Sequence, residues 1–400
     1  MYNKKLILPD GKHIYPCYMD AEQRQVMKEK YKDVRSFMRC GCRPGANLYY
    51  GISEDLRIYP LHHNYQHDKF CCRFKDESGN PERQTAYIIS EEDGEVVAYT
   101  SFNPLNFNVN EPDESEEQNN VLPDEETENV EEIVVGKEDV EKPTEKKEPK
   151  LSVEGLIRSI NTDSFTERIL NNQSVKSADK FAVHVYHRMK KVRLFRTKRY
   201  IGDLTLEKDG CRFIYMPYVR LDQKEENGAL KCHIITRLPD GKECKNFIYP
   251  ETMAKVAKKF GKTYGMEPDE HTMIAGFQYV MKTRQGRQYK VLGRIHLFQV
   301  SDIGLYCRSM TEVAAFNSLQ KIVEQNKNIR YWIPPEDPEV GAIVEIEGMD
   351  KKILMLFKSK KSEHVTYDNT MYVPCVVDSE TLITESMLYE MLSECNSNSF

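Results

Sequence analysis

Short apolar runs separated by turns dominate the first hundred residues. The segment LILPDGKHIYPC places a Pro-Asp-Gly turn between two apolar runs, which predicts a hairpin within residues 1–20. Residues 21–38 repeat apolar positions at helical spacing and predict a helix. A second hairpin is expected over residues 84–102, with its turn at Glu92–Gly94. We therefore expect a small α+β unit, whose modest core needs a further stabilising device such as a metal.

Helical spacing returns after residue 150 and then gives way to strands. LSVEGLIRSI, SFTERIL and SADKFAVHVYHRMKKV predict three successive helices. From Ile201 onward the pattern predicts two hairpins, around Lys208–Gly210 and Pro239–Gly241. PETMAKVAKKFG then predicts a short helix with proline near its start and glycine at its end.

The last third of the chain alternates between strands and helices. Two long strands joined at Gln285–Gly286 precede a helix over residues 309–326. VGAIVEI and KKILMLF predict two further strands, and MYVPCVV and TLITESMLYEML predict a closing strand and helix. We therefore expect an α+β protein of several domains. Their expected limits are residues 1–102, 103–150, 151–265 and 266–400.

The net charge of −6 conceals an uneven distribution. Residues 111–150 hold sixteen Asp or Glu and five Lys or Arg, a local charge of −11 that leaves +5 for the rest of the chain. Such a segment is typical of a disordered acidic linker, so residues 103–150 are interpreted as a solvated tether. The alternatives are an acidic mimic of nucleic acid that occupies a basic groove of its own chain, and a docking element for a partner protein.

Membrane insertion is not expected. No apolar run approaches the length of a membrane span, and the first residues lack the apolar core of a signal peptide. We therefore predict a cytoplasmic protein with no membrane partner. In that compartment the eleven cysteines are thiols or metal ligands rather than disulfides.

Cysteine and histidine concentrate between residues 40 and 72. A tetrahedral zinc site takes four Cys or His ligands in two close pairs, which Cys40 with Cys42 and His67 with Cys71 would supply. The alternate ligands are His62, His63 and Cys72. We expect the zinc to be structural, because a catalytic zinc needs an open position and a neighbouring acid or base. A thiol-lined core without metal is the main alternative, followed by a redox pair or a reactive cysteine.

Positive charge concentrates in residues 188–199, which carry seven cations within twelve positions. They are Arg188, Lys190, Lys191, Arg193, Arg196, Lys198 and Arg199. Cations at this density neutralise nucleic-acid phosphates whatever the base sequence, and the interleaved apolar residues keep the element packed. The alternative is a solvated helix end, where cations suit the helix dipole. We favour nucleic acid, with further contacts from the short helix through Lys255, Lys258, Lys259 and Lys262.

The order of elements in the C-terminal third resembles the PD-(D/E)XK restriction-endonuclease-like fold. That resemblance implies an Asp at the end of one strand and a (D/E)-x-K on the next, which bind Mg²⁺ and position water. Gly341 stands in place of the Asp, and Met355 and Phe357 replace the acid and the lysine. The remaining catalytic candidates are Glu312, Glu345 and Lys358. We therefore expect a domain of nuclease-like form that is inactive, or an ordinary α/β sheet with exposed Glu and Lys.

Several short patterns resemble an uncharacterised bacterial domain-of-unknown-function family marked by three N-terminal cysteines. They are CGC at residues 40–42, HxxxC at residues 67–71, the helix LSVEGLI, and the segment from LFQVSDIG to NIRYWIPP. The likeness spans most of the chain outside the acidic linker. It implies an association with bacterial mobile elements or defence systems, without an established activity.

These observations predict a non-enzymatic protein that binds nucleic acid or serves as an accessory factor, with a structural zinc site. The main alternative is a nuclease dependent on Mg²⁺ or Mn²⁺ that uses Glu312 and Glu345. A further alternative is a subunit that docks to a partner protein through residues 111–150. No phosphate-binding glycine loop, nucleophile elbow or HExxH motif indicates another chemistry.

Overall fold

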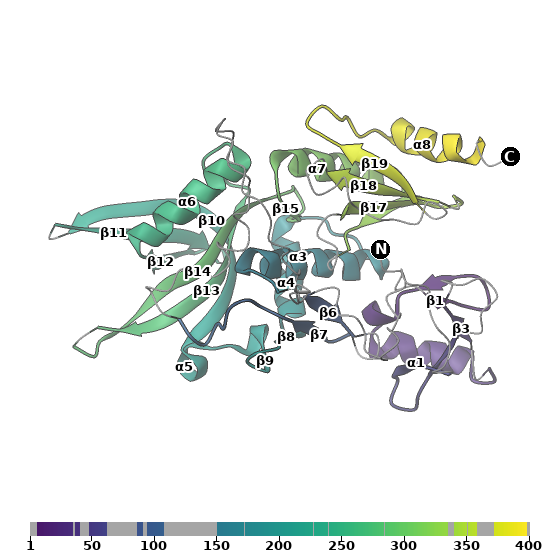
Figure 1. Cartoon of the computed structure of the whole chain (residues 1–400), viewed down its shortest axis with the longest axis horizontal. Helices are drawn as coiled ribbons and strands as arrows, with labels where there is room; N and C mark the ends of the chain where they lie inside the picture. Colours follow the sequence, from purple (N-terminus) through teal and green to yellow (C-terminus); the bar gives the residue numbers. More distant parts are fainter. Residues whose placement is uncertain are drawn as a thin grey trace, which may run out of the picture.

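Helices and sheets are combined throughout the computed structural model of this chain, which confirms the α+β class. The structure describes residues 6–34, 37–40, 48–61, 86–90, 94–107, 150–171, 173–226, 228–238, 240–283, 285–334, 340–349, 351–357 and 372–397. Within these ranges a central helix lies among a small N-terminal module, a barrel and two further sheets (Figure 1).

The N-terminal module, taken as the described residues from 6 to 61, is built on an antiparallel sheet of order β2-β1-β3-β4-β5. Its elements are β1 Leu6–Ile7, β2 His13–Ile14, the 3-10 helix η1 Pro16–Tyr18, α1 Ala21–Lys30, β3 Met38–Arg39, β4 Tyr49–Ile52 and β5 Ile58–Pro60. The module has an apolar core of its own, to which Leu6, Met38 and Cys40 belong. The predicted hairpin is confirmed by the pairing of β1 with β2.

Helix α1 is shorter than predicted. It begins at a capping box formed by Asp20 and Gln23 and ends at Lys30 instead of continuing to residue 38. The chain turns after the helix, where the ring of Tyr31 stacks on that of Phe37, and β3 then pairs with β1. Sheet pairing therefore overrides helical spacing in this stretch.

A closed five-stranded barrel forms the part of the body that is drawn to the left in Figure 1. Its elements are β10 Cys211–Glu226, β11 Ala229–Arg237, β12 Glu243–Ile248, α6 Pro250–Tyr264, β13 Thr272–Lys282 and β14 Gln288–Val300, with β15 Tyr306–Cys307 paired to the end of β14. Antiparallel neighbours run β12-β11-β10-β13-β14. Strand β12 also pairs in parallel with β14, at Ile248 and Leu292, which closes the barrel.

The connectivity of this barrel is that of the OB fold. Its first strand pairs with the second and the fourth, its third pairs with the fifth, and a helix separates the third from the fourth. The helix α6 begins with Pro250 in its first turn and ends at Gly265, whose φ of 68° suits glycine. The predicted hairpin around Pro239–Gly241 and the two long strands joined at Gln285–Gly286 are confirmed as β11–β12 and β13–β14.

The C-terminal sheet has the order β16-β17-β18-β19, antiparallel except for the parallel pair β18–β19. Its elements are α7 Met310–Gln325, β16 Ile329–Trp332, β17 Val340–Ile346, β18 Lys352–Phe357, β19 Tyr372–Val377 and α8 Glu385–Ser397. Helix α7 packs on one face through Phe316, which contacts Tyr331 and Phe357. On the opposite face Trp332 belongs to a separate apolar cluster, against which Ile169 of the central helix packs.

A fourth sheet contains strands from before and after the acidic segment. It contains β6 Tyr87–Ile89, β7 Val96–Ala98, β8 Val192–Leu194 and β9 Arg199–Tyr200. The antiparallel pair β6–β7 confirms the predicted second hairpin, and β7 then pairs in parallel with β8. Thr100 forms a β-bridge with Leu151, so these two residues lie side by side although the acidic segment separates them in sequence.

The sheets do not follow the expected domain limits. The β7–β8 pair joins strands from both sides of residues 103–150, and the β10–β13 pair crosses the limit at residue 265. The start of the expected linker also packs on the body, because Phe107 stacks on Tyr279 with ring centroids 4.1 Å apart. The interpretation of residues 108–149 as disordered falls outside the described residues.

Helix α3, Val153–Leu170, is the central helix of Figure 1 and is continuous where the sequence predicts two helices. The polar residues in its middle are buried and bonded to neighbouring elements. The Asn161 side chain donates to the Tyr215 hydroxyl at 2.6 Å and to the Gly304 carbonyl at 3.0 Å, and it accepts from the Tyr306 amide at 2.8 Å. The Thr166 hydroxyl donates to a backbone carbonyl at 2.5 Å. The polar residues that made the sequence look like two helices therefore anchor one continuous α3 to its neighbours.

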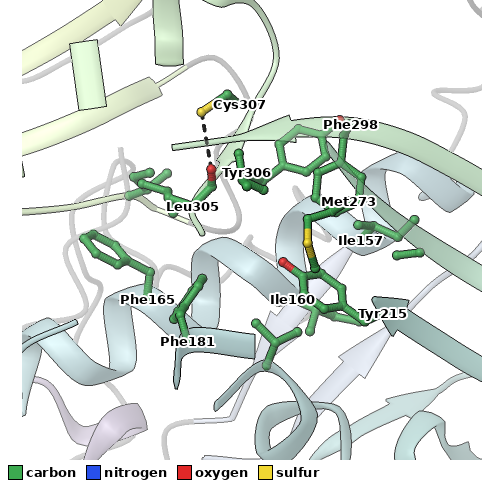
Figure 2. Close-up of a cluster of buried hydrophobic side chains, with 14 of the residues drawn as sticks. Ile157, Ile160, Phe165, Phe181, Tyr215, Met273, Phe298, Leu305, Tyr306 and Cys307 are labelled. Carbon is green, nitrogen blue, oxygen red and sulfur yellow. Dashed lines mark hydrogen bonds between the residues drawn. The ribbon is translucent and has the colours of Figure 1, made fainter. Parts of the chain in front are cut away.

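The apolar side chains of α3 reach into a core shared with the barrel and with α4, Ala178–Met189 (Figure 2). The residues of this shared core that are labelled in the figure are Ile157, Ile160, Phe165, Phe181, Tyr215, Met273, Phe298, Leu305, Tyr306 and Cys307. Because one core serves α3, α4 and the barrel, these elements form one packed body.

One predicted hairpin is wrong. The stretch around Lys208–Gly210 forms the 3-10 helix η2 Ile201–Asp203 and the short helix α5 Leu206–Asp209 before β10 begins. The side chain of Thr205 caps α5, and Gly210 ends it with a φ of 69°. Caps at both ends therefore favour a helical turn over a strand here.

Candidate nucleic-acid interface

Most of the predicted zinc site cannot be placed. Cys40 follows β3 with its side chain fully buried, and its backbone N–H donates to the Leu48 carbonyl at 2.9 Å. The other ligands and alternates, which are Cys42, His67, Cys71, His62, His63 and Cys72, lie outside the described residues. Within the described ranges no three His, Cys, Asp or Glu side chains are grouped to hold a metal ion. The zinc site stays a prediction.

The basic run at residues 188–199 divides into buried and exposed cations. Arg188, the last-turn arginine of α4, is 1% exposed. Its Nε donates to Asp163 at 2.6 Å, and the Tyr87 hydroxyl donates to the same carboxylate oxygen at 2.8 Å. Although burial opposes its charge, Asp163 and Glu167 hold the pKa of Arg188 above its ordinary value. In this structure Arg188 is an internal ion-pair partner and does not reach a phosphate, contrary to its predicted role.

Two further members of the run have acidic partners. Lys191 lies 3.2 Å from a Glu167 oxygen, and Arg199 lies 3.0 Å from Asp209. Both cations remain exposed, so these ion pairs are worth little and do not prevent contact with a phosphate. Lys190 is also exposed, and within the described residues it has no acidic partner.

The rest of the run forms an exposed basic turn, defined as residues 195–198, between β8 and β9. Phe195 is 54% exposed, and its ring stacks on Tyr99 with centroids 4.4 Å apart. Arg196 and Lys198 flank this pair without an acidic partner in the described part of the chain. Arg193 lies half-buried on the same sheet, and its Nε has no hydrogen-bond partner. An exposed aromatic ring among cations is suited to a base and its phosphate.

The lysines of α6 lie on the exposed side of that helix. Lys259 forms an ion pair with Glu154 at 2.8 Å. Lys255, Lys258 and Lys262 have no acidic partner among the described residues. In Figure 1 helix α6 is drawn above the barrel strands and β9 below them, so these lysines form a separate positive surface.

The endonuclease-like positions are filled by apolar side chains. A Cβ on Gly341 would collide with the ring of Phe357, so this place on the sheet has no room for a carboxylate. Met355 is fully buried. Lys358 lies outside the described residues.

The two acidic candidates lie on opposite faces of the C-terminal sheet. Glu345 alternates along β17 with Val344 and Ile346, which belong to the core on the α7 side, so it points the other way. There its carboxylate bonds to Arg330 at 2.9 Å and to Lys352 at 3.3 Å. Glu312 belongs to α7 itself. The pairing of Glu312 with Glu345 as ligands of one metal ion is therefore wrong.

The Glu312 carboxylate is engaged by Arg308, four residues earlier, at the start of α7. It accepts from the backbone N–H of Arg308 at 2.6 Å and from the side chain of the same arginine. The Arg308 guanidinium in turn lies 5.9 Å from the centre of the Phe357 ring. The carboxylate therefore accepts hydrogen bonds at the N-terminus of α7, and this role is structural.

The barrel carries an aromatic surface that the sequence did not reveal. We define the barrel face as His233 on β11, Phe247 and Tyr249 at β12, and Tyr289 on β14. The strand neighbours of Phe247 are buried inside the barrel, so Phe247 and Tyr249 point outward. The Phe247 ring centroid lies 5.6 Å from that of His233, 5.4 Å from that of Tyr249 and 6.2 Å from that of Tyr289.

Hydrogen bonding holds this aromatic row in place. The hydroxyls of Tyr249 and Tyr289 lie 2.7 Å apart and bridge β12 and β14, the two strands whose pairing closes the barrel. Burial and the Tyr289 hydroxyl raise the pKa of Tyr249 to about 12, so its hydroxyl stays neutral at physiological pH. All four rings are half-buried, which leaves part of each open to a ligand.

Exposed cations lie around the β13–β14 turn, where Lys282 and Lys290 alternate with Met281 and Tyr289 and therefore extend on the side of the hairpin opposite to the Tyr289 ring. Lys282, Arg287 and Lys290 lie at the β13–β14 turn, are exposed, and have no acidic partner within the described residues. Across the face, Lys245 neutralises Asp222 at 2.8 Å. Local acidity is thus balanced while the turn keeps three unpaired positive charges, a pattern suited to a polyanion.

The aromatic row escaped sequence reasoning because its members come from three separated strands. Two signals were available. Alternation in KNFIY places Phe247 and Tyr249 on one side of a strand, and the order of two hairpins around one helix matches the barrel connectivity. Neither signal reveals that β12 meets β14, which is what brings Tyr289 to Tyr249.

None of the helices in the described ranges combines the length and apolar character needed to cross a membrane. Comparisons with protein-family models, with curated proteins and with solved structures give no match to this chain.

Proposed function

We propose that this protein binds single-stranded nucleic acid on the barrel face. The observation that carries the proposal is the aromatic row on the second, third and fifth strands of a barrel with OB connectivity. In such barrels the second and third strands and the adjoining loops are the usual place for an oligonucleotide. Half-exposed rings offer stacking platforms to bases of any identity.

The charge distribution supports a strand that runs along the barrel face towards the β13–β14 turn. Arg287, in the turn itself, would lie against a phosphate while the bases stack on Phe247 and its neighbours, and Lys282 and Lys290 on the other side of the hairpin attract the strand from a longer range. The basic turn, with Phe195, offers a second contact of the same chemistry. Neither surface presents a set of directed polar groups for reading base edges, so we expect little sequence specificity.

Fluorescence anisotropy with a labelled oligothymidylate at rising salt tests this function. Each stacked base is worth about 1–3 kcal/mol, so Phe247→Ala should weaken binding by about five- to a hundredfold. Replacing Arg287 by Gln should lower the slope of log affinity against log salt by about 0.7, the value for one phosphate contact with a single strand. The matched controls are Tyr59→Ala, an aromatic residue that is 37% exposed on the N-terminal module, and the double variant Lys321→Gln, Lys327→Gln on α7 and the turn after it.

The proposal fails if wild-type protein does not bind at low salt. It fails equally if Phe247→Ala binds as tightly as Tyr59→Ala. A preference for duplex over single strand would also contradict a stacking mechanism. Arg196→Gln with Lys198→Gln measures the share of the basic turn, with an expected loss of several-fold that diminishes at high salt.

A role as an accessory factor of a bacterial mobile element or defence system is consistent with such binding, and we retain it as part of the proposal. The nuclease alternative finds no support, because Glu312 and Glu345 lie on opposite faces of the C-terminal sheet and a Cβ at Gly341 would collide with the Phe357 ring. Docking to a partner protein through residues 111–150 concerns a segment outside the described residues and stays a prediction.

A further inference from the structure

A cleft of about 530 Å³ separates the N-terminal module from the ends of α3 and α4. Charged and titratable side chains line both walls, among them Asp20, Arg24, Asp55 and Arg57 on the module and Glu167, Arg168, His184, His187 and Lys191 on the helices. A volume of this size is in the range of small-molecule sites. The cleft lies apart from the barrel face, and none of the residues that form that face lines it.

Arg168 is the unusual member of this cleft. Its guanidinium is half-buried, and within the described residues no carboxylate pairs with it. One of its terminal nitrogens lies 3.1 Å from Nδ1 of His184, and its Nε has no hydrogen-bond partner. Burial lowers the pKa of Arg168, which expresses the cost of keeping this charge without a counter-ion.

Glu167, the neighbouring acid, offsets the effect of burial on the pKa of Arg168 only in part, and no ion pair joins the two among the described residues. Glu167 directs its carboxylate to Lys191 at 3.2 Å and to Arg188 at 3.4 Å. Because Arg168 donates to Nδ1 of His184, the ring proton of that histidine lies on Nε2 and is available to a ligand. The helix wall therefore presents a guanidinium, an imidazole N–H and the exposed His187, while its carboxylate, that of Glu167, is already paired with Lys191 and Arg188.

Backbone constraints fix the opposite wall. Leu56 has a φ of 62°, a left-handed conformation that is costly for a branched side chain. Its carbonyl accepts from the Arg24 guanidinium at 3.1 Å, which also donates to the carbonyl of Pro16 at 2.8 Å. Gly94 closes the cleft with a φ of 72°, where a Cβ would lie 2.8 Å from the Cys17 carbonyl oxygen. This preformed wall holds the exposed Arg57 across from Arg168.

We infer that the cleft binds a phosphate monoester, with Arg168 as its principal ligand and His184, His187 and Arg57 around it. Guanidinium groups suit phosphate because two parallel N–H donors match two oxygens. The cleft is larger than one phosphate group, so the ester carries an organic part. Two sources share this chemistry: a free metabolite of the nucleotide type and the terminal phosphate of a nucleic-acid strand.

Isothermal titration calorimetry with the full chain in a phosphate-free buffer tests the site. Adenosine 5′-monophosphate should bind at least about tenfold more tightly than adenosine, since only the former carries the charged group. Arg168→Gln should reduce the affinity for the monophosphate at least about tenfold, whereas the exposed Lys321→Gln should leave it unchanged. If Arg168→Gln unfolds, His187→Gln at an exposed position takes its place, with a several-fold loss expected.

Two oligothymidylates, one 5′-phosphorylated and one with a 5′-hydroxyl, separate the sources. A gain from the 5′-phosphate that disappears in Arg168→Gln assigns the cleft to strand ends. Binding of the mononucleotide without such a gain assigns it to a free metabolite. Equal affinity for monophosphate and adenosine, or full affinity in both Arg168→Gln and His187→Gln, overturns the inference. Phe247→Ala addresses the barrel face alone, so the two proposals fail separately.

Discussion

Removal of the carboxylate from the buried pair Asp163–Arg188 is the most informative single change in this protein. The sequence predicts that Arg188 contacts nucleic acid, whereas the structure places it 1% exposed against Asp163. In Asp163→Asn the arginine keeps only the 3.4 Å contact with Glu167 as an ionic partner. The Tyr87 hydroxyl also loses its charged acceptor.

The expected cost follows from the burial of both partners. Breaking a buried ion pair by neutralising one side costs about 3–5 kcal/mol, because the other charge stays in the interior. For a chain of this length about 1 kcal/mol corresponds to about 1–2 °C in Tm, so Asp163→Asn should melt about 3–10 °C below wild type. Replacing both partners by apolar residues, as in Asp163→Leu with Arg188→Met, should recover at least half of that loss.

Thermal unfolding monitored by circular dichroism measures these differences, and oligonucleotide binding well below the transition completes the assay. Arg188→Met should lower Tm by several degrees while the folded variant binds nucleic acid like wild type. Arg196→Met on the exposed basic turn should do the reverse. If Arg188→Met melts within about 1 °C of wild type, or loses affinity while stable, the buried-pair interpretation is refuted.

Three further predictions concern pH, packing and metal. Burial lowers the pKa of His296 to about 4 in the folded chain against about 6.5 when unfolded, so the unfolded state binds more protons. Urea unfolding should therefore show a loss of about 2 kcal/mol from pH 7 to pH 5 that is absent in His296→Gln. Gly341→Ala should lower the free energy of unfolding by about 1–3 kcal/mol, since its Cβ would overlap the Phe357 ring, and no Tm change would contradict this packing. Elemental analysis should find about one zinc per chain in wild type and little in Cys40→Ser, and a metal-free wild type would exclude the structural site.

Elements specified by local sequence were predicted well. Helix α7 follows Ser309, whose side chain caps it as the sequence position indicates, and the strands around Gln285–Gly286 pair as a hairpin. Both depend on residues that are close in the chain. Helix α3 was missed as one element because its buried polar side chains satisfy their hydrogen bonds with distant segments, as Asn161 does with Tyr215 and Gly304.

For the candidate sites too, local features could be predicted and features that depend on long-range packing could not. Residue type and spacing singled out Arg196 and Lys198 as candidates and the structure shows both exposed, but exposure itself cannot be inferred from composition. Arg188 has its carboxylate on another helix, so its burial depends on how α3 and α4 pack. The barrel face requires the parallel contact of Ile248 with Leu292, which no local pattern encodes.

The bridge between Thr100 and Leu151 holds side by side the two parts of the chain that flank the acidic segment. The Ser101 amide donates to the Leu151 carbonyl at 2.9 Å, and the Leu151 amide donates to that of Tyr99 at 2.8 Å, so the segments that precede and follow the acidic stretch are hydrogen-bonded to each other here. The described chain continues from Thr100 along the barrel to Phe107, whose ring stacks on Tyr279. The bridge and the β7–β8 pair therefore fix β7 beside the body without any contribution from residues 108–149. Closing a loop between two fixed points costs only about 0.6 kcal/mol more for each doubling of its length, so a neutral replacement of residues 108–149 should leave both binding surfaces intact.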